Sequence, residues 1–428
     1  MIIATPSRRY GVPIDIPGMT RLPIYKDVSQ QYVTNKRYHS QLSPLFVRAN
    51  NESYVDALFN TCRPCIIDRN AKVIAYLNKD DVTKLLSGSA ADLTKWDSPV
   101  VLQYGGFYSK YEYDSATNEK KKKLSTLPIK GYTYHRRRFR GLYDGTVVTN
   151  SVDGSSKSFL TSNAGVYSTH NVSLQNFHAY AKNLGPSFRA MSWQDHEILT
   201  WLFWIIEGTT NSQAVYRGIV DVNSANWAAY NKSADGGQPT YGQFHLNGIT
   251  NDIVGHKGEK TITISDFPNG AITVKPHKWN CIENFIAGPY WVAATGRLFS
   301  NDNVYEFKDL SKIAFTVNSD ASLLCSIAGI KPDTNEWQRI LETYRDTLVP
   351  EVIGGSDTTG YCDQWHGLAS MGAGPYVPLL RGRATSGSAA GLGVLYSLSG
   401  PADATAYIGA VLASDDPSDP IPDGWVVS

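Results

Sequence analysis

Apolar residues recur at helical spacing in two separate segments of the chain. In residues 174–184, an apolar face follows Ser173, which can cap the N-terminus, and precedes Gly185-Pro186, which can end the helix. In residues 337–348, Trp, Ile, Leu and Tyr keep a similar spacing up to Pro350. Because residues three or four apart share one helix face, the pattern predicts a helix in both segments.

A third segment is apolar on every side rather than on one. Residues 198–206 are apolar except for one Thr, and Ser192 with Asp195 just before them has the spacing of a capping box. A helix without a polar face must be surrounded by other elements, so we expect a central, buried helix here. The run is also shorter than the roughly 20 residues that a membrane span needs.

The remaining pattern is typical of strands. Residues 65–76 predict a hairpin that turns at Asp68-Arg69-Asn70. Residues 100–113 predict a strand with a bulge at Gly105-Gly106. From about residue 210 onward, we expect short strands separated by long loops of Gly, Ser and Asn.

The C-terminal region contains few bulky polar side chains. Residues 379–413 include two apolar runs, 390–396 and 407–412, around a segment of Ser, Thr, Ala and Gly. We expect two neighbouring strands that hold this segment. Such a segment can vary without disturbing the strands, which suits a display surface better than a reaction centre.

Length and composition favour a folded chain with more than one domain. Of 428 residues, 42% are hydrophobic and 18% are charged, which excludes wholesale disorder. A net charge of +1 gives no general attraction to nucleic acid or to a membrane surface. We expect an extended attachment arm at residues 1–50, a small β-rich module at 51–125 and a larger domain at 126–428.

Prolines punctuate the arm and favour an extended backbone. Five apolar residues give it anchors that a free tail would not need, and these are the expected attachment residues: Ile14, Ile16, Leu22, Ile24 and Tyr25. The first residues lack a signal-peptide core, so we expect synthesis in the host cytoplasm, without export or membrane insertion.

Reactive side chains are present, but they do not form a recognisable catalytic motif. Cys62-Arg-Pro-Cys65 has the spacing of a redox pair, yet strand-like residues follow it and no second pair completes a zinc site. His135, His178, His196 and His366 are scattered, and the chain has no phosphate loop or nucleophile elbow. We therefore expect no catalytic residue, no metal site and no cofactor.

Two basic clusters have alternative interpretations. We expect Lys120–Lys123 to be the solvated tip of a hairpin, with an anionic contact as the alternative. Arg136–Arg138 lies between Tyr134 and Phe139, and arginines interleaved with aromatics are found in nucleic-acid surfaces. Because the chain is nearly neutral, we favour a structural role or a subunit contact and expect no nucleic-acid partner.

A collinear set of motifs supports a family resemblance over residues 60–413. The set comprises Leu127–Tyr132, His135 with Phe139, Gly141–Gly145, Asn183–Gly185, Met191–Phe203, Asn211–Val215, Gly248–Asn251, Trp279–Phe285, Arg381-Gly382 and Tyr407–Ala410. The chain thereby resembles the C-type-lectin-fold proteins of tailed phages and of prophages of gut anaerobes. These include tail-fibre adhesins and targets of diversity-generating retroelements, and they share their fold with formylglycine-generating enzymes.

The resemblance implies an α+β fold in which a C-type-lectin-like domain, residues 126–428, follows the β-rich module and the arm. It places Ile282–Phe285 and Arg381-Gly382 in the core of that domain. It places the binding surface on loops 384–390 and 397–406. Trp365 and His366 could also orient a sugar, although Trp365 could instead be a core residue with polar neighbours. The expected receptor-binding residues are Trp365, His366, Arg383, Thr385, Ser386, Ser388, Tyr396, Ser399, Asp403 and Thr405.

Three departures from the family pattern restrict the function. Residues 379–413 lack the cysteine pair that the formylglycine-generating enzymes use, so we expect no oxidase chemistry. Gln238-Pro239-Thr240 lacks the carboxylate that calcium-dependent sugar binding requires. The C-terminal loops are rich in Ser, Ala and Gly rather than in the Asn and Tyr of diversified loops.

The expected function is that of a bacteriophage virion protein without enzymatic activity. It would be a fibre or receptor-binding protein, a homotrimer that joins other virion proteins and adheres non-covalently to a host surface polysaccharide or protein. The alternative is an architectural head or tail protein, such as a head fibre, collar or tail decoration, that binds only other virion subunits. The alternative predicts that removing residues 1–50 abolishes incorporation, whereas changes at Ser386–Ala390 leave adsorption unchanged.

Overall fold

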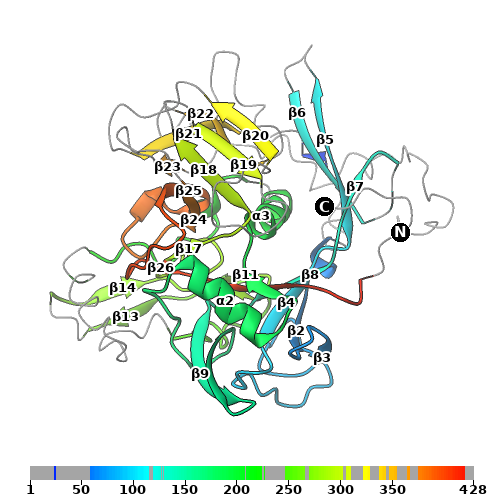
Figure 1. Cartoon of the computed structure of the whole chain (residues 1–428), viewed down its shortest axis with the longest axis vertical. Coiled ribbons are helices and arrows are strands. Elements are labelled where there is room, and N and C mark those ends of the chain that lie inside the picture. The colour runs from blue at the N-terminus through cyan, green and yellow to red at the C-terminus, as the bar shows by residue number, and fades with distance from the viewer. Residues whose placement is uncertain are drawn as a thin grey trace.

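Strands make up most of the secondary structure in this computed structural model, and the described residues after 210 form mostly short strands and loops, as predicted (Figure 1). The structure describes residues 24–25, 58–114, 119–126, 128, 130–207, 209–223, 226, 246–265, 269–301, 305–309, 322–327, 337–343, 347–353, 364–366 and 375–419. Within these residues, two large sheets and one buried helix organise the fold, and smaller sheets surround them.

The first large sheet combines six strands from distant parts of the chain. In order, they are β11 (Phe188–Ala190), β27 (Leu412–Asp415), β8 (Arg138–Gly141), β4 (Val100–Tyr104), β2 (Arg63–Ile67) and β3 (Val73–Tyr76). The pairing of β2 with β3 confirms the predicted hairpin, and the Asp68 carboxylate accepts hydrogen bonds from the Asn70 and Lys72 N–H groups in its turn. Because β4 pairs with β8, this sheet contains strands from both sides of the predicted boundary at residue 125.

The second large sheet has seven strands and carries the C-terminal region. In order, they are β22 (Pro350–Ile353), β21 (Trp337–Thr343), β23 (Gln364–His366), β25 (Gly391–Ser399), β24 (Val377–Arg381), β17 (Trp291–Ala293) and β26 (Ile408–Gly409). Strands β24 and β25 are neighbours. The second predicted apolar run, residues 407–412, divides between β26 in this sheet and β27 in the other.

The predicted helix at residues 337–348 is wrong, because the chain forms strands β21 and β22 there. Trp337 and Gln338 pair with β23, and Ile340 is completely buried in the core. Apolar residues a few positions apart fit one helix face, but they also fit a strand whose neighbours bury them. Cross-strand pairing and burial outweigh the local spacing in this segment.

Both other predicted helices are confirmed. Helix α2 (Leu174–Leu184) begins after Ser173, whose hydroxyl accepts a hydrogen bond from the Asn176 N–H at 3.3 Å, and it ends at Gly185. Helix α3 (Trp193–Glu207) begins with a capping box: the Ser192 N–H donates to the Asp195 carboxylate at 2.8 Å, and the Asp195 N–H donates to the Ser192 hydroxyl at 3.2 Å.

Helix α3 is buried nearly all round, and its polar side chains bond to other elements. The ring Nε2 of His196 lies 2.6 Å from the carbonyl oxygen of Leu392 in β25. Burial lowers the pKa of His196 to about 3, so the ring is neutral and its Nε2–H donates to that carbonyl. The Glu197 carboxylate accepts a hydrogen bond from the Leu348 N–H at 2.9 Å. The helix therefore fixes both β25 and the segment before β22.

Asp195 connects α3 to three strands of the six-stranded sheet. Its carboxylate accepts hydrogen bonds from the Tyr104 hydroxyl of β4 at 2.7 Å and from Arg189 of β11 at 2.9 and 3.0 Å, and Arg138 of β8 lies 3.4 Å away. Burial alone would raise the pKa of Asp195, but the two guanidinium groups lower it to about 2. The position of Arg138 agrees with the structural role favoured for Arg136–Arg138.

A four-stranded sheet extends from the six-stranded one (Figure 1). Its order is β1 (Ile24–Tyr25), β6 (Glu119–Ser125), β5 (Phe107–Asp114) and β7 (Thr133–His135). Two predictions are corrected: Lys120–Lys123 lies within β6, where all four residues pair with β5 and Lys122 and Lys123 also pair with β1, and Gly105-Gly106 is a corner between two sheets rather than a bulge. A Cβ on Gly105 would lie 2.2 Å from the Arg136 carbonyl oxygen, so only glycine fits.

The first strand of that sheet comes from the predicted arm. Ile24 and Tyr25 pair with Lys123 and Lys122 of β6. The other predicted anchors, Ile14, Ile16 and Leu22, lie outside the described residues. Attachment by this arm therefore stays a prediction.

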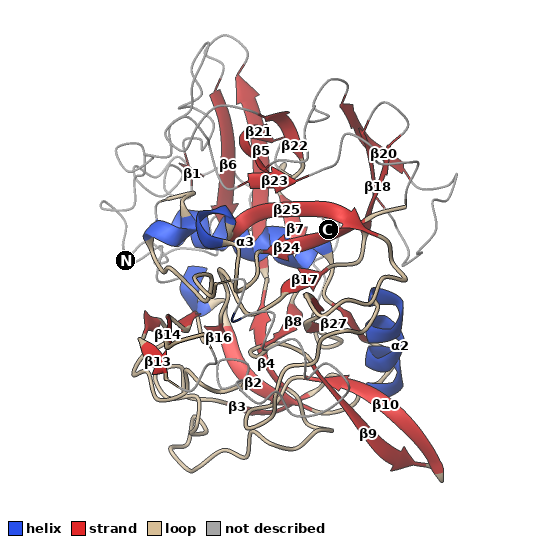
Figure 2. Cartoon of the chain, turned by 90° about the vertical axis from the view of Figure 1, so that its left-hand side faces the viewer, coloured by secondary structure: helices blue, strands red, loops and turns tan. Residues whose placement is uncertain are grey.

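The smaller elements complete the fold around these sheets (Figure 2). The hairpin β9–β10 packs on α2 and projects away from the body. The bounds are β9 (Thr146–Val152), β10 (Ser155–Thr161), β12 (Gly258–Glu259), β13 (Ile262–Ile264), β14 (Ile272–Val274), β15 (His277–Trp279), β16 (Ile282–Glu283), β18 (Arg297–Asn301), β19 (Tyr305–Asp309) and β20 (Ser322–Ile327).

The substitution Asp195→Asn is expected to lower the free energy of unfolding by about 3–5 kcal/mol, because it removes the buried carboxylate that Arg138 and Arg189 share and leaves Arg189 with Asp415 alone. Asp153→Asn at the exposed tip of the β9–β10 hairpin is the control, with an expected change under about 0.5 kcal/mol. Urea denaturation measures both. A loss below about 1 kcal/mol in Asp195→Asn would contradict the assigned network.

The stabilising effect of Asp195 is also expected to depend on pH. A carboxyl group whose pKa in the fold is about 2, below its ordinary 3.8, stabilises the fold above that ordinary value and loses this effect as the pH falls towards 2. The difference in unfolding free energy between the natural protein and Asp195→Asn should therefore be constant above about pH 5 and shrink at lower pH. Urea titrations from neutral to acid pH test this, and a difference that grows on acidification would refute it.

Candidate functional site

Four motifs that are distant in the sequence meet around the buried Arg381 side chain. Its guanidinium donates hydrogen bonds to both oxygens of the Asp144 carboxylate, at 3.0 and 3.1 Å, and to the Asn284 carbonyl oxygen, at 2.9 Å. The Gly145 N–H, next to Asp144, donates to the Ala410 carbonyl oxygen at 2.8 Å. The burial of Arg381 and Asn284 agrees with the core positions expected for their motifs.

The Arg381-Gly382 pair turns the chain from β24 into a loop above the seven-stranded sheet. Both residues have left-handed backbone conformations, with φ of 75° and 92°. A Cβ on Gly382 would lie 2.6 Å from the Cβ of Ala390, so the turn requires glycine there. The loop passes through a short 3₁₀ turn at Gly387–Ala389 and returns to the sheet as β25. Residues 383–386 are thereby held at the sheet surface.

One row of side chains crosses four neighbouring strands of this sheet. Trp337 of β21 lies opposite His366 of β23, which in turn lies opposite Tyr396 of β25. Tyr396 lies opposite Leu379 of β24. Because directly opposed residues project from the same face of a sheet, these four side chains form a continuous row.

The opposite face of the sheet belongs to the core around α3. Trp365, Leu395 and Leu380 form the adjacent row in the register and are buried in the same apolar cluster as α3. The Trp365 indole N–H donates to the Ser397 hydroxyl at 3.1 Å. Since neighbouring residues of a strand project to opposite faces, His366 and Trp365 cannot share one surface. The predicted binding role of Trp365 is therefore wrong, and its alternative as a core residue holds.

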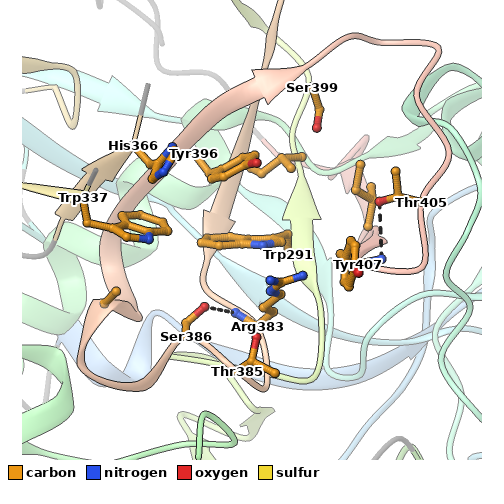
Figure 3. A pocket seen from close by; sticks show the side chains of 13 residues that line it. Trp291, Trp337, His366, Arg383, Thr385, Ser386, Tyr396, Ser399, Thr405 and Tyr407 are labelled. Atoms are coloured by element: carbon orange, nitrogen blue, oxygen red, sulfur yellow. Dashed lines mark hydrogen bonds between the residues drawn. The ribbon is translucent and has the colours of Figure 1, made fainter. Parts of the chain in front are cut away.

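A pocket of about 550 Å³ opens on the face that carries His366 and Tyr396 (Figure 3). Its volume lies within the range of about 300–1,000 Å³ that is typical of small-molecule sites. Leu379, Ala389 and Ile408 provide small or aliphatic parts of its lining, and aromatic and polar side chains provide the rest.

Aromatic rings form most of one side of the pocket. The rings of Trp291 and Trp337 are nearly parallel, at 16°, with centroids 5.7 Å apart. Tyr396 stacks on Trp291 at 5.3 Å and on His366 at 5.2 Å. Figure 3 shows these rings side by side along the pocket. Since Trp337 and Tyr396 are partly exposed, the group presents ring surface to a ligand.

Polar groups gather on the other side. The Ser386 hydroxyl accepts a hydrogen bond from the Arg383 backbone N–H at 3.0 Å, and the Thr405 hydroxyl accepts one from the Tyr407 N–H at 3.4 Å. The Arg383 guanidinium carbon lies 4.1 Å from the centre of the Tyr407 ring. Burial raises the pKa of Tyr396, and the nearby charge of Arg383 opposes that effect. The pocket thus combines ring faces with hydroxyl groups and one cation.

The structure brings most of the predicted binding residues together. Those that line the pocket are His366, Arg383, Thr385, Ser386, Tyr396, Ser399 and Thr405. Trp365, Ser388 and Asp403 do not line it. Ser388 is exposed on the 3₁₀ turn, and the Asp403 carboxylate accepts a hydrogen bond from the Gly400 N–H at 2.7 Å.

Sequence reasoning missed Trp291, Trp337 and Tyr407, which also line the pocket. The apolar spacing around Trp337 predicted a helix, Trp291 begins a short strand without a motif, and Tyr407 belongs to the Tyr407–Ala410 motif but was given no binding role. The available signal was composition: the chain has 10 Trp and 25 Tyr. That signal indicates an aromatic surface but does not say which rings form it.

The three cysteines whose side chains the structure describes are buried. Cys62, Cys65 and Cys281 are free thiols, and burial raises the pKa of Cys281 to about 12, so this thiol is protonated at neutral pH. Among the described residues, no group of three or more His, Cys, Asp or Glu side chains is placed to hold a metal ion. Among the described residues, the aromatic pocket is therefore the group of side chains best suited to bind a ligand.

Comparison with known proteins gives no family: no protein-family model matches the chain, and no curated protein matches it significantly. Within the described residues, no helix is long and apolar enough to cross a membrane. The geometry of the pocket must therefore support the functional assignment by itself.

The substitution Gly382→Ala is expected to destabilise the protein by about 2–4 kcal/mol, because it adds a steric clash with Ala390 to the strain of a left-handed residue. Gly154→Ala is the matched control. Gly154 also has a positive φ, 74°, but nothing lies within 4 Å of an added Cβ, so only the strain applies. Urea denaturation compares the two, and equal losses would show that the close approach to Ala390 has no energetic effect.

Proposed function

We propose that this chain is a bacteriophage virion fibre or receptor-binding protein whose C-type-lectin-like domain adheres non-covalently to a host surface saccharide. The observation that carries the proposal is the pocket lined by Trp291, Trp337 and Tyr396 beside hydroxyl groups. Sugar rings combine polarised C–H bonds on their faces with hydroxyls on their edges. An aromatic surface attracts the C–H groups, and neighbouring polar side chains bond the hydroxyls.

The arrangement of the motifs that carry the family resemblance supports the lectin-like part of the proposal. The Asp144, Asn284 and Arg381 segments, which carry the family resemblance, are joined by direct hydrogen bonds in one buried cluster. Five of the thirteen pocket-lining residues lie on the loops where the resemblance implies the binding surface: Thr385, Ser386, Ala389, Ser399 and Thr405.

A homotrimer on the virion would suit a site of this kind. A single shallow sugar pocket gives weak binding, and several linked copies raise the effective affinity without new contacts. The arm at residues 1–50 would join the protein to other virion subunits, and the pairing of Ile24-Tyr25 with β6 gives that segment a fixed point on the domain.

Immunogold electron microscopy of intact particles, with antibody against residues 126–428, tests the virion assignment. Label at fibre tips or at the end of the tail supports a receptor-binding protein. Label over the capsid or a collar favours an architectural virion protein that binds only other subunits, and no label on any particle rejects the virion assignment.

The substitution Trp337→Ala is expected to weaken saccharide binding about tenfold, because it removes one of the stacked rings. A glycan array that carries bacterial polysaccharides identifies the ligand, and calorimetry with that ligand measures the change. Trp96→Ala is the control, since Trp96 is also partly exposed but packs at a tilt against Phe159, outside the pocket. Equal affinity in the natural protein and Trp337→Ala would reject the pocket as the binding site.

A further inference from the structure

We propose that the pocket selects an acidic saccharide, a sugar that carries a carboxylate, phosphate or sulfate group, and that Arg383 binds this group. The inference rests on the proposed function, because it specifies the chemical class of the sugar that the pocket would hold. It is carried by the position of Arg383 and by the absence of opposing charge among the described residues of the lining.

Arg383 is the one Lys, Arg, Asp or Glu side chain among the described residues that line the pocket. Its backbone N–H bonds to Ser386, whereas its guanidinium has neither an ion pair nor a hydrogen bond within the described part of the chain. Other arginines of this fold are used differently. Arg381 and Arg189 are buried against the carboxylates of Asp144 and Asp195. Arg383 therefore keeps its hydrogen-bond donors available to a ligand.

The contact with Tyr407 orients these donors. The guanidinium carbon lies 4.1 Å from the ring centre, and Figure 3 shows the group between the Trp291 and Tyr407 rings. A guanidinium held by its face keeps its N–H edge free, and that edge matches the two oxygens of a carboxylate or phosphate. The ring contact also restricts the side chain before binding, which lowers the entropy lost on binding.

Nothing in the described lining neutralises this charge. Asp403, on the loop that follows β25, does not line the pocket, and its carboxylate accepts a hydrogen bond from the Gly400 N–H. The hydroxyls of Thr385 and Ser386 stand on the same loop as Arg383 and can bond the ring hydroxyls or further oxygens of the acidic group. An anion would thus meet one cation and several donors without a repelling charge.

The competing interpretation is that Arg383 only packs on Tyr407 and that the pocket takes neutral sugars. The two interpretations differ in one measurable respect. If Arg383 binds an acidic group, removing that group from the ligand and removing the guanidinium from the protein have the same effect and are not additive. If it only packs, neither change alters selectivity.

A glycan array with neutral, carboxylated, phosphorylated and sulfated saccharides, probed with the full chain, is the first experiment. We expect the bound saccharides to carry an acidic group, and the type of group that binds distinguishes the three anions. Each bound saccharide is then compared with its neutral counterpart, carboxyl-reduced, dephosphorylated or desulfated. The neutral form is expected to bind roughly tenfold more weakly or worse, as for the loss of a charged hydrogen bond.

Arg383→Gln is expected to bind the acidic saccharide as weakly as the natural protein binds the neutral one, and to bind the neutral form unchanged. Arg383→Lys should recover part of the preference, because it restores the charge without the planar fork. Arg63→Gln is the control, since Arg63 also stacks on a tyrosine, Tyr76, at 3.5 Å but lies outside the pocket.

The outcomes separate this inference from the proposed function. Binding of neutral and acidic forms with equal affinity, unchanged in Arg383→Gln, overturns the acidic class while sugar binding stands. Absence of any bound saccharide on the array overturns both. A preference for acidic forms that persists in Arg383→Gln overturns the role of Arg383.

Discussion

The buried ion pair between Arg381 and Asp144 is the interaction on which the site depends. An unpaired charge at either position would be costly, and breaking such a pair typically costs about 3–5 kcal/mol. The pair therefore fixes the end of β24 against a segment far away in the sequence. It also compensates for the left-handed conformation of Arg381, which costs about 1–3 kcal/mol. The loop that follows can leave the sheet only in the direction that this turn allows.

Helix α3 supplies the second constraint, because it is buried on nearly all sides and still contains charged and polar residues. Asp195 bonds to side chains of three strands of the six-stranded sheet. His196 bonds to β25 of the seven-stranded sheet, and Glu197 bonds to the segment just before β22. Buried polar groups of this kind must find their partners, so they specify how the two sheets are placed around the helix. Packing of apolar side chains alone would leave more freedom in that placement.

The pocket is a consequence of these two constraints. One face of the seven-stranded sheet packs against α3, so the alternate residues of the same strands project from the opposite face and form the pocket surface. Trp337, His366 and Tyr396 come from three strands and become neighbours only through their register. The Arg381-Gly382 turn then adds the polar loop and Arg383 beside the rings. A rigid sheet thus holds the ring faces, and short loops of small residues hold the polar groups.

The sequence by itself determined the elements whose signals are local. Caps and periodicity predicted α2 and α3, turn residues predicted the β2–β3 hairpin, and the small C-terminal loops indicated the region of most pocket residues. Only the tertiary structure decided that residues 337–343 are a strand, that Trp291 and Tyr407 join the pocket and that Trp365 faces the core. These outcomes depend on strand register, and a shift of one residue would exchange the two faces of a strand. Register is set by partner strands that lie tens of residues or more away along the chain, which no local pattern encodes.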